Sequence, residues 1–457
     1  MSAMSGRRFA WAILVIAVLV FGGWTSAAAG AVPAGAPIPD PVATPDPVAT
    51  PDPVATPDPV ATPDPVATPD PEPSPQPTPE ASGGELAIGL TEPNPNLIWP
   101  ATAKEVPGPF APWRDAVADL RPHFYRLQID WALLQPDPDA PIELDRFNGG
   151  CMRVILPCGP WLGLREQLQA LAARQKEGGW ETVVTISGTP GWAAQAPNGC
   201  EQPDVTPRSR SPRPDALKAY QRMIVEVLAA AEAVGAELRW WNAWNEPNHP
   251  YFLSPQRATC DVNSPSQTVE VYSGLHDALG EALAAAPGDQ RRILGDLAGT
   301  AGRGPRLTSV AEFIAGLSQE MVCGTRVWAQ HAYLAPRDDA VVAADALAAR
   351  GCPPASGHEI WVTETGARNL VAKDPPPLRR CQGMHTRLRR WYSDPRITVA
   401  FQYTAREDDG FPFGLITPEL DAAYPVLGLW QAWGSRARPA PTDPAPIGDT
   451  ACRPPPL

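Results

Sequence analysis

Residues 238–248 read LRWWNAWNEPN, an apolar run followed at once by a polar stretch that contains one proline. The apolar part, Leu238–Trp244, has the length and aromatic content of a buried strand. Before it, Ala216–Val234 carries apolar side chains at helical spacing. A helix followed by an apolar strand that ends in polar residues is the repeating unit of covered parallel sheets, so this segment predicts an α/β fold.

The same unit recurs along the chain. Seven further apolar runs are predicted strands, namely Leu86–Leu90, Phe124–Asp130, Thr182–Ser187, Arg292–Asp296, Val327–Ala332, Ile360–Thr363 and Thr398–Tyr403. Further helical patterns cover Thr268–Ala285, Thr308–Met321 and Ala340–Arg350. Eight such strands in about 350 residues predict a single (β/α)8 TIM barrel. An open doubly wound sheet would place Gly-x-Gly-x-x-Gly after its first strand, and residues 88–93, IGLTEP, contain no such turn.

The regions outside the barrel differ from it in composition. Residues 1–31 combine Arg7 and Arg8 with an apolar run and small residues, which is typical of a secretory signal peptide; an uncleaved membrane anchor is the alternative. Residues 32–84 contain five Pro-Asp-Pro-Val-Ala-Thr hexads that start at Pro39, and they predict a disordered, acidic linker. The barrel domain is therefore expected at 85–436, followed by a proline-rich tail at 437–457.

Charge and cysteine content restrict the partners and the compartment. The net charge is −13 and no basic run is present, so no nucleic-acid partner is expected. The eight cysteines show no Cys-x-x-Cys spacing, which favours disulfides in an exported protein. From the loops and faces that the barrel topology gives them, the predicted pairs are Cys200–Cys260, Cys323–Cys352, Cys151–Cys158 and Cys381–Cys452.

Polar side chains gather where the predicted strands end, which is where barrels of this kind carry their sites. Glu246 and Glu364 each end a strand, and a pair of carboxyl groups is what hydrolysis of a glycosidic bond requires. Nearby tryptophans, Trp192 among them, suit the apolar faces of sugar rings. Structural interpretations remain open, because a strand-end glutamate is often a loop cap or ion-pair partner. Arg126 could likewise be an ion-pair partner in the core, and His331 a buried histidine with its hydrogen bonds satisfied.

Several segments resemble a known group of enzymes. The Trp-Asn-Glu-Pro-Asn and Trp-Val-Thr-Glu-Thr-Gly motifs resemble the signatures of the clan A glycoside hydrolases. Within that clan, the Gly-Thr-Pro-Gly-Trp-Ala segment and His-Ala-Tyr are most similar to family 39, which includes β-xylosidases and related endoglycosidases, with family 5 next. The similarity spans roughly residues 88–433 and keeps the order of the motifs. It implies a (β/α)8 barrel with glycosidase activity.

The resemblance also implies roles for individual residues in a retaining double displacement. Glu364 matches the nucleophile, and Glu246 matches the general acid/base. The matching substrate-site and supporting residues are Arg126, Asn245, His331 and Tyr333, with Asn245 binding the sugar 2-hydroxyl and Arg126 and Tyr333 orienting the nucleophile. Glu246 has no predicted cationic partner and is therefore expected to hold the proton. Tyr403 stands where the clan usually has tryptophan, and we predict that its ring lies under the sugar at the cleavage point.

Together these features predict a secreted retaining β-glycosidase that acts on an extracellular polysaccharide or oligosaccharide. Two alternatives stay open: a barrel that binds glycan without cleaving it, and a transglycosylase that remodels wall polysaccharide. The expected partner is a carbohydrate, and the N-terminal segment could tether the protein to a cell wall or membrane. No metal or cofactor is expected, and the six histidines form no close ligand pair. A Ser-His-Asp hydrolase is not expected either, because no Gly-x-Ser-x-Gly is present.

Overall fold

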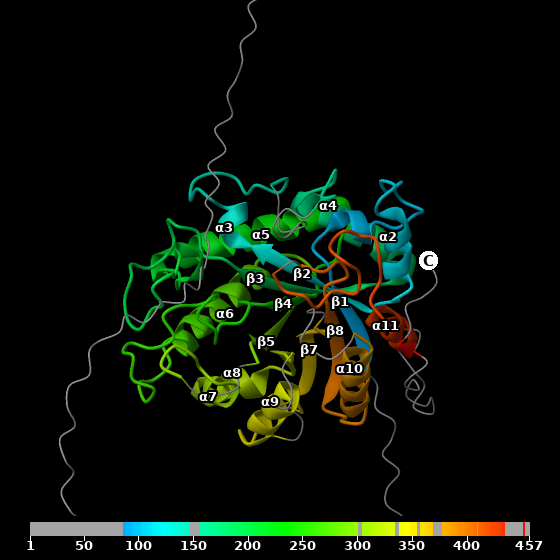
Figure 1. Ribbon diagram of the computed structural model, residues 1–457. Helices are drawn as coiled ribbons and strands as arrows, with labels where there is room; N and C mark the ends of the chain where they lie inside the picture. Colours follow the sequence, from blue (N-terminus) through cyan, green and yellow to red (C-terminus); the bar gives the residue numbers. More distant parts are fainter. Residues whose placement is uncertain are drawn as a thin grey trace, which may run out of the picture. The chain divides into compact units, whose positions relative to one another are not determined.

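The computed structural model describes residues 86–146, 156–299, 304–333, 338–353, 357–368, 377–408, 410–434 and 451–452. Eight parallel strands in these ranges close into a barrel in the order of the sequence, which confirms the predicted (β/α)8 architecture (Figure 1). The strands are β1 Ala87–Thr91, β2 Phe124–Asp130, β3 Glu181–Ser187, β4 Trp240–Asn242, β5 Arg291–Leu297, β6 Val327–His331, β7 Glu359–Thr365 and β8 Ile397–Tyr403. Strand β8 pairs with β1, with Tyr403 opposite Thr91, and this pairing closes the barrel.

Helices cover the outside of the barrel between the strands (Figure 1). They are α1 Pro95–Ile98, α2 Ala111–Ala118, α3 Trp131–Leu134, α4 Gly163–Gly178, α5 Leu217–Val234, α6 Thr268–Ala284, α7 Val310–Gly316, α8 Gln319–Gly324, α9 Asp339–Ala348, α10 Pro377–Tyr392 and α11 Val426–Gly434. The pattern over 308–321 predicted one helix, but the structure has two. The chain is extended at Leu317 and Ser318, and the Ser318 hydroxyl accepts from the Met321 amide at 3.1 Å, so a second helix begins there.

Strand β4 is shorter than the sequence indicated. The predicted strand covered Leu238–Trp244, whereas the ladder includes only Trp240–Asn242. After Asn242 the chain turns, and the side-chain oxygen of Asn242 accepts from the Trp244 amide at 3.0 Å. This turn directs the residues that follow over the end of the barrel.

The barrel interior is filled by side chains. A cluster of buried apolar residues lies inside the barrel, on the amino-terminal side of the polar residues at the strand ends. This cluster contains Phe124, Val183, Ile293, Val327, Ala329, Trp361, Val399 and Phe401. The rings of Phe124 and Trp361 lie 4.8 Å apart, centre to centre. A larger apolar cluster lies between the strands and the helices. Because the interior is closed by packing, a ligand can approach only at the ends of the strands.

Three of the four predicted disulfides are present: Cys200–Cys260, Cys323–Cys352 and Cys381–Cys452. Cys158 is also disulfide-bonded, but Cys151 lies outside the described residues, so the Cys151–Cys158 pair stays a prediction. The predicted signal peptide, the repeat linker and most of the C-terminal tail also lie outside them.

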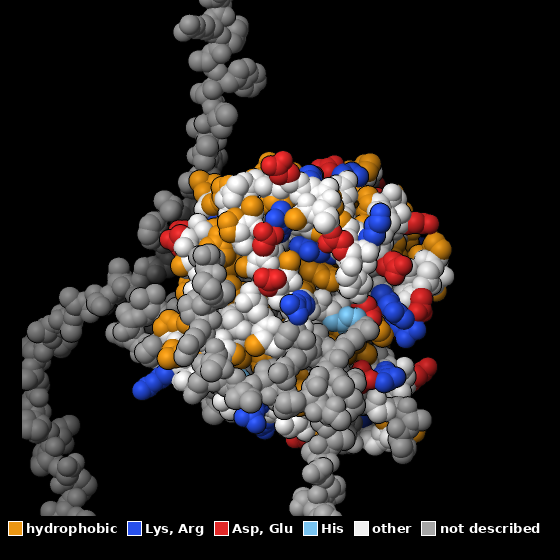
Figure 2. Space-filling view, turned by 90° about the vertical axis from the view of Figure 1, so that its right-hand side faces the viewer, with side chains coloured by type: hydrophobic (Ala, Val, Ile, Leu, Met, Phe, Trp, Pro, Cys, Tyr) orange, Lys and Arg blue, Asp and Glu red, His pale blue; other side chains and the backbone are white. Residues whose placement is uncertain are grey.

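The described surface is mixed in character. On the face shown in Figure 2, acidic and basic side chains are interspersed, with apolar side chains scattered among them. Across the described ranges, no helix combines the length and the apolar character that crossing a membrane requires.

Candidate active site

The loop after β4 places Glu246 over the barrel end by a local change of backbone direction. Glu246 has φ 44°, a left-handed conformation that is uncommon for residues other than glycine. Its amide donates to the carbonyl oxygen of Asp296 at 2.9 Å, and the amide of Asn245 donates to that of Ile186 at 2.8 Å. The side-chain amide of Asn248 donates to the carbonyl of Ala298 at 3.0 Å, which joins the loops after β4 and β5.

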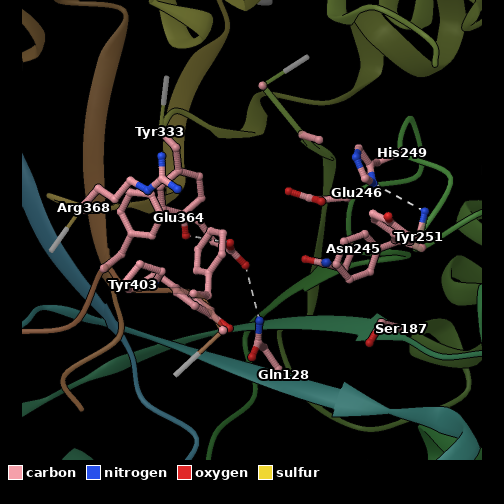
Figure 3. A pocket seen from close by; sticks show the side chains of 18 of the residues that line it. Gln128, Ser187, Asn245, Glu246, His249, Tyr251, Tyr333, Glu364, Arg368 and Tyr403 are labelled. Atoms are coloured by element: carbon pink, nitrogen blue, oxygen red, sulfur yellow. Dashed lines mark hydrogen bonds between the residues drawn. The ribbon is translucent and has the colours of Figure 1, made fainter. Parts of the chain in front are cut away.

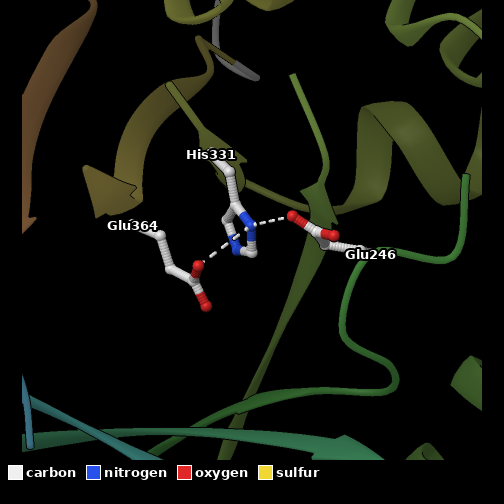
Figure 4. Close-up of side chains that lie close together, drawn as sticks. All are labelled: Glu246, His331 and Glu364. Atoms are coloured by element: carbon white, nitrogen blue, oxygen red, sulfur yellow. Dashed lines mark hydrogen bonds and ion pairs between the residues drawn. The ribbon is translucent and has the colours of Figure 1, made fainter. Parts of the chain in front are cut away.

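Glu246 and Glu364 converge on His331, which lies between them (Figure 4). His331 Nδ1 lies 2.7 Å from Glu246 Oε1 and 3.4 Å from Glu364 Oε2. One oxygen of each carboxylate and one histidine nitrogen all lie within 4.8 Å of one another. The structure therefore brings the two predicted glutamates together at the carboxyl ends of β4 and β7.

Arg126 on β2 is fully buried and bonds two of the predicted site residues, Glu364 and Asn245. Its Nη1 donates to Glu364 Oε1 at 2.6 Å. Its Nη2 donates to Asn245 Oδ1 at 2.6 Å and to Asp296 Oδ2 at 2.7 Å. A planar guanidinium with these partners fixes the positions of three oxygens, one each from β7, β5 and the loop after β4.

Glu364 is held from three sides. Besides Arg126, it accepts from the hydroxyl of Tyr333 at 2.9 Å, through Oε2, and from the side-chain amide of Gln128 at 3.3 Å, through Oε1. Burial, followed by the charge of Glu364, raises the pKa of Tyr333 well above its usual range, so the phenol keeps its proton and remains a donor. Gln128 was not among the predicted site residues.

His331 faces a carboxylate on each ring nitrogen, because Nε2 lies 3.2 Å from Asp296 Oδ1. Nε2 donates to the ionised Asp296 and Nδ1 donates to Glu246 Oε1, which accepts whether or not Glu246 carries a proton on its other oxygen, so the ring is an imidazolium. Burial lowers the pKa of His331, but Glu364 and Asp296 outweigh it and raise that pKa to about 10. The expectation that Glu246 lacks a cationic partner is therefore wrong: its partner is His331.

Asp296 is the central acceptor of the site and was missed by sequence reasoning. It accepts from Arg126 as described, and from the hydroxyls of Thr185 at 2.7 Å and Thr363 at 2.6 Å. Burial opposes ionisation, yet Arg126 and then His331 hold the pKa of Asp296 well below its usual range. A lone acid in the apolar second half of a strand is the signal that could have identified it, since an unpaired charge is rarely buried.

A break in the β5 ladder turns Asp296 toward the site. The register between β5 and β6 shifts between Gly295 and Leu297, and Asp296 has φ 60°. Gly295 has φ +93°, and a Cβ there would lie 2.3 Å from the carbonyl oxygen of Ala329. Only glycine fits at this position, so Gly295 permits the bulge that presents Asp296.

The two glutamates line a pocket of about 1410 Å³. Figure 3 shows Glu246 on one side, with His249 and Tyr251, and Glu364 on the other, with Tyr333 and Tyr403. The aromatic part of the wall contains Tyr333, Tyr403, Phe411 and Phe413, with Tyr403 and Phe411 5.4 Å apart at a steep angle. Tyr403 thus lies in the pocket wall and not among the outer helices, and its place under a sugar ring stays a prediction.

Trp192 does not line this pocket, in contrast to its predicted role. Its ring packs edge-on against Trp131 at 5.7 Å, and its indole N–H donates to the carbonyl of Gln135 at 2.9 Å. The turn after β3 carries the indole toward α3, where burial and this hydrogen bond fix it. Trp192 is therefore a structural contact between two loops.

A metal ion would be a poor fit to the Glu246–His331–Glu364 group. The charged form of His331 has no lone pair to donate, and Arg126 already bonds Glu364. A cation would have to displace a proton and then lie close to a guanidinium. The donor set suits proton transfer and orientation.

Comparisons with known proteins give similarities of architecture. No family model and no curated protein matches the chain. Similar solved structures include a family 30 endoxylanase from Clostridium papyrosolvens (11% identity, 78% of this chain and 74% of that chain, TM-score 0.47). A family 39 glycoside hydrolase from Bacteroides cellulosilyticus (12%, 79% and 65%, TM-score 0.47) and a family 5 protein from Streptomyces cattleya in complex with GlcNAc (17%, 81% and 87%, TM-score 0.48) are also similar. At such identities and TM-scores the likeness is one of barrel fold, and what the site can do follows from its own side chains.

Proposed function

We propose that this protein is a retaining glycoside hydrolase whose nucleophile is Glu364 and whose general acid/base is Glu246. One observation carries the proposal: an oxygen of each carboxylate lies within 4.8 Å of the other, across a pocket wide enough for sugars. Retaining enzymes hold their two carboxyl groups about 5–5.5 Å apart, whereas inverting enzymes leave room for a water at about 6.5–9.5 Å. The spacing supports direct attack by one carboxylate.

In the first step, Glu364 attacks the anomeric carbon while Glu246 gives its proton to the departing glycosidic oxygen. A covalent ester to Glu364 forms, and the leaving group departs as a neutral alcohol. In the second step, ionised Glu246 takes a proton from water, and the resulting hydroxide attacks the anomeric carbon. This attack releases Glu364 as a carboxylate and returns the proton to Glu246.

The surrounding residues support this division of roles. Arg126 and Tyr333 each donate to a different oxygen of Glu364, so the carboxylate is fixed in one orientation and its negative charge is stabilised. His331 donates to Glu246 Oε1, which leaves Oε2 as the oxygen that carries the catalytic proton. Asp296 acts through His331 and Arg126 and is a positioning residue. Asn245 and Tyr403 lie where they can contact the sugar.

We further propose that the enzyme works outside the cell on a β-linked glycan. Three disulfides in the described residues suit an oxidising compartment. The N-terminal apolar segment and the proline-rich repeats supply an export signal and a spacer, with tethering to a wall or membrane as the role of that spacer.

The test is hydrolysis of a panel of aryl β-glycosides and β-linked polysaccharides, with the anomeric form of the first product followed by NMR. We expect the β-anomer first. Glu364→Gln should abolish turnover without loss of fold, and Glu246→Ala should slow substrates with poor leaving groups far more than activated aryl glycosides, because activated groups need little protonation. Arg389→Ala, on the exposed side of α10, is a matched control that should leave activity unchanged.

Three outcomes would contradict the proposal. An inverted product would rule out double displacement. Sugar binding without turnover of any substrate would favour a glycan-binding barrel, and transfer to an added acceptor sugar in place of water would favour a transglycosylase.

A further inference from the structure

One wall of the pocket is formed by an unusually basic helix. Helix α10 carries five arginines and no acidic residue, in a chain whose net charge is −13. Four of its residues line the pocket: Arg380, Gly383, Met384 and Arg387. Their spacing places them on one face of the helix. Arg368, from the segment between β7 and α10, lines the same pocket.

The acidic side chains of the pocket are matched by cations of their own. Asp130 pairs with Arg208, and the Glu246 and Glu364 carboxyl groups pair with His331 and Arg126 as described. None of these three cations lines the pocket. The positive charge of the α10 side therefore faces a cavity whose carboxylates are already neutralised.

Arg387 is fixed in the wall by the backbone. Its guanidinium donates through Nη1 to the carbonyl oxygens of Ala332 at 2.9 Å and Tyr333 at 3.1 Å. Burial lowers the pKa of Arg387, and the charges of Asp338 and Asp339 oppose that effect only in part. The structure thus keeps an incompletely compensated cation next to the segment that carries Tyr333.

Arg368 is exposed, and it has no carboxylate partner among the described residues. It follows Glu364 by four residues. Figure 3 places its side chain on the Tyr333 and Tyr403 side of the pocket, across from Glu246. A guanidinium in this position can take a carboxylate or a sulfate through two parallel hydrogen bonds.

The position relative to the two glutamates indicates which sugar Arg368 would contact. Glu246 protonates the oxygen that departs, so the leaving group lies on its side of the pocket. The sugar that Glu364 attacks lies on the opposite side, where Arg368 is and where Arg387 bonds the backbone of Tyr333. We infer that this sugar carries an anionic group, a carboxylate or a sulfate ester, that pairs with Arg368. The inference rests on the proposed function and adds a substrate class to it.

The test compares three p-nitrophenyl β-glycosides that differ at one carbon: the glucoside, the glucuronide and the glucoside 6-sulfate. The wild-type protein should have a kcat/KM for one of the two anionic substrates that is about tenfold or more above that for the neutral glucoside. The anionic substrate with the higher kcat/KM identifies the anion as a carboxylate or a sulfate ester. Arg368→Ala should remove this preference mainly through KM and leave the neutral glucoside within about twofold. Arg389→Ala, on α10 but outside the pocket, should change neither. Added salt should weaken the preference, because Arg368 is exposed.

Calorimetric binding of D-glucuronate, glucose 6-sulfate and glucose to wild type and Arg368→Ala separates the two proposals. Hydrolysis of the neutral glycoside alone, with no anion binding, would refute the anionic subsite and leave the glycosidase in place. Anion binding that Arg368→Ala removes, without hydrolysis of any glycoside, would support the subsite and refute the glycosidase. Equal losses on neutral and anionic substrates in Arg368→Ala would also overturn the inference.

Discussion

Asp296→Asn tests whether the buried acid, and no other group, keeps His331 charged. The carboxylate accepts at both oxygens: Oδ2 from Arg126 and Thr185, and Oδ1 from His331 and Thr363. An amide of the same shape offers one acceptor atom and one donor. Arginine cannot release its proton, so the amide oxygen should face Arg126 and the NH2 group should face His331, whose Nε2 then has to lose its proton.

The magnitude follows from the contacts that remain. The variant keeps the Nδ1–H bond to Glu246 but loses the imidazolium charge, and burial then lowers the His331 pKa without the opposing charge of Asp296. We expect this pKa to fall from about 10 to below its ordinary value of 6.5. Removal of one partner from a buried ion pair costs about 3–5 kcal/mol in the free energy of unfolding. Arg126 and His331 would also be less well oriented. If this costs about 3 kcal/mol of transition-state stabilisation, kcat/KM should fall by about 10²-fold.

The assay is 15N-detected NMR of the histidine rings between pH 5 and 11, with His331→Gln used to assign the resonances. Wild type should show imidazolium shifts on both His331 nitrogens at pH 8, and Asp296→Asn should show a neutral ring protonated at Nδ1. Glu312→Gln is the matched control. Glu312 accepts two short hydrogen bonds from Arg257, which is fully buried like Arg126, but Glu312 does not line the pocket. This variant should lower stability and leave the His331 titration unchanged.

Two results would refute the reasoning. An unchanged His331 titration in Asp296→Asn would show that Glu246 and Glu364 alone hold the charge. A neutral His331 in the wild type at pH 8 would show that the hydrogen-bonded geometry does not require an imidazolium.

Four further outcomes are expected. Tyr333→Phe removes the donor to Glu364 Oε2 and should lower kcat/KM by about tenfold or more, mostly in kcat, with Tm nearly unchanged. Tyr403→Ala should lower kcat/KM by about tenfold and Tyr403→Phe by less, and wild-type kinetics for Tyr403→Ala would exclude it from the site. Replacement of Cys323 and Cys352 by serine opens a loop with a sequence separation of 29 at the end of the barrel away from the pocket; it should reduce the free energy of unfolding by about 3.5 kcal/mol without change in kcat. Burial raises the pKa of Glu92 from 4.5 to about 7, so the folded chain keeps a proton that the unfolded chain has lost between these values. The free energy of unfolding should therefore fall as the pH rises from 4.5 to 7, by up to about 3 kcal/mol, and chemical denaturation of Glu92→Gln should lack this contribution.

The strands could be predicted because most of their residues are buried on one face or the other and are therefore apolar. The expected range of β2 matches the observed one, and β8 begins one residue earlier than expected. The two glutamates could be predicted because polar residues directly after a barrel strand must lie at one end of the barrel. Both inferences depend only on local pattern and topology.

The remaining features depend on backbone irregularity, which a periodic pattern does not contain. Asp296 reads as an interior strand residue until the bulge at Gly295 reverses its side, and His331 was expected to contact the site without its bond to Glu246. Trp192 was expected at the sugar site but does not line this pocket, because an aromatic residue in a loop can cover a sugar or another indole, and only the path of the chain separates the two. Interactions between loops decide these cases.

The bulge at Gly295 also affects how tolerance to mutation in this chain should be interpreted. In a saturation library scored for activity, Gly295 should be as intolerant as Glu364, because any Cβ there collides with the Ala329 carbonyl and rotates the acid beside it out of the site. A ranking of positions by tolerance alone would therefore place Gly295 among the residues that take part in the proposed reaction, although it has no side chain that could reach a substrate. For transplantation of this site into another barrel, the consequence is that the glycine has to be moved together with Asp296 and the four side chains that bond to Asp296, namely Arg126, Thr185, His331 and Thr363.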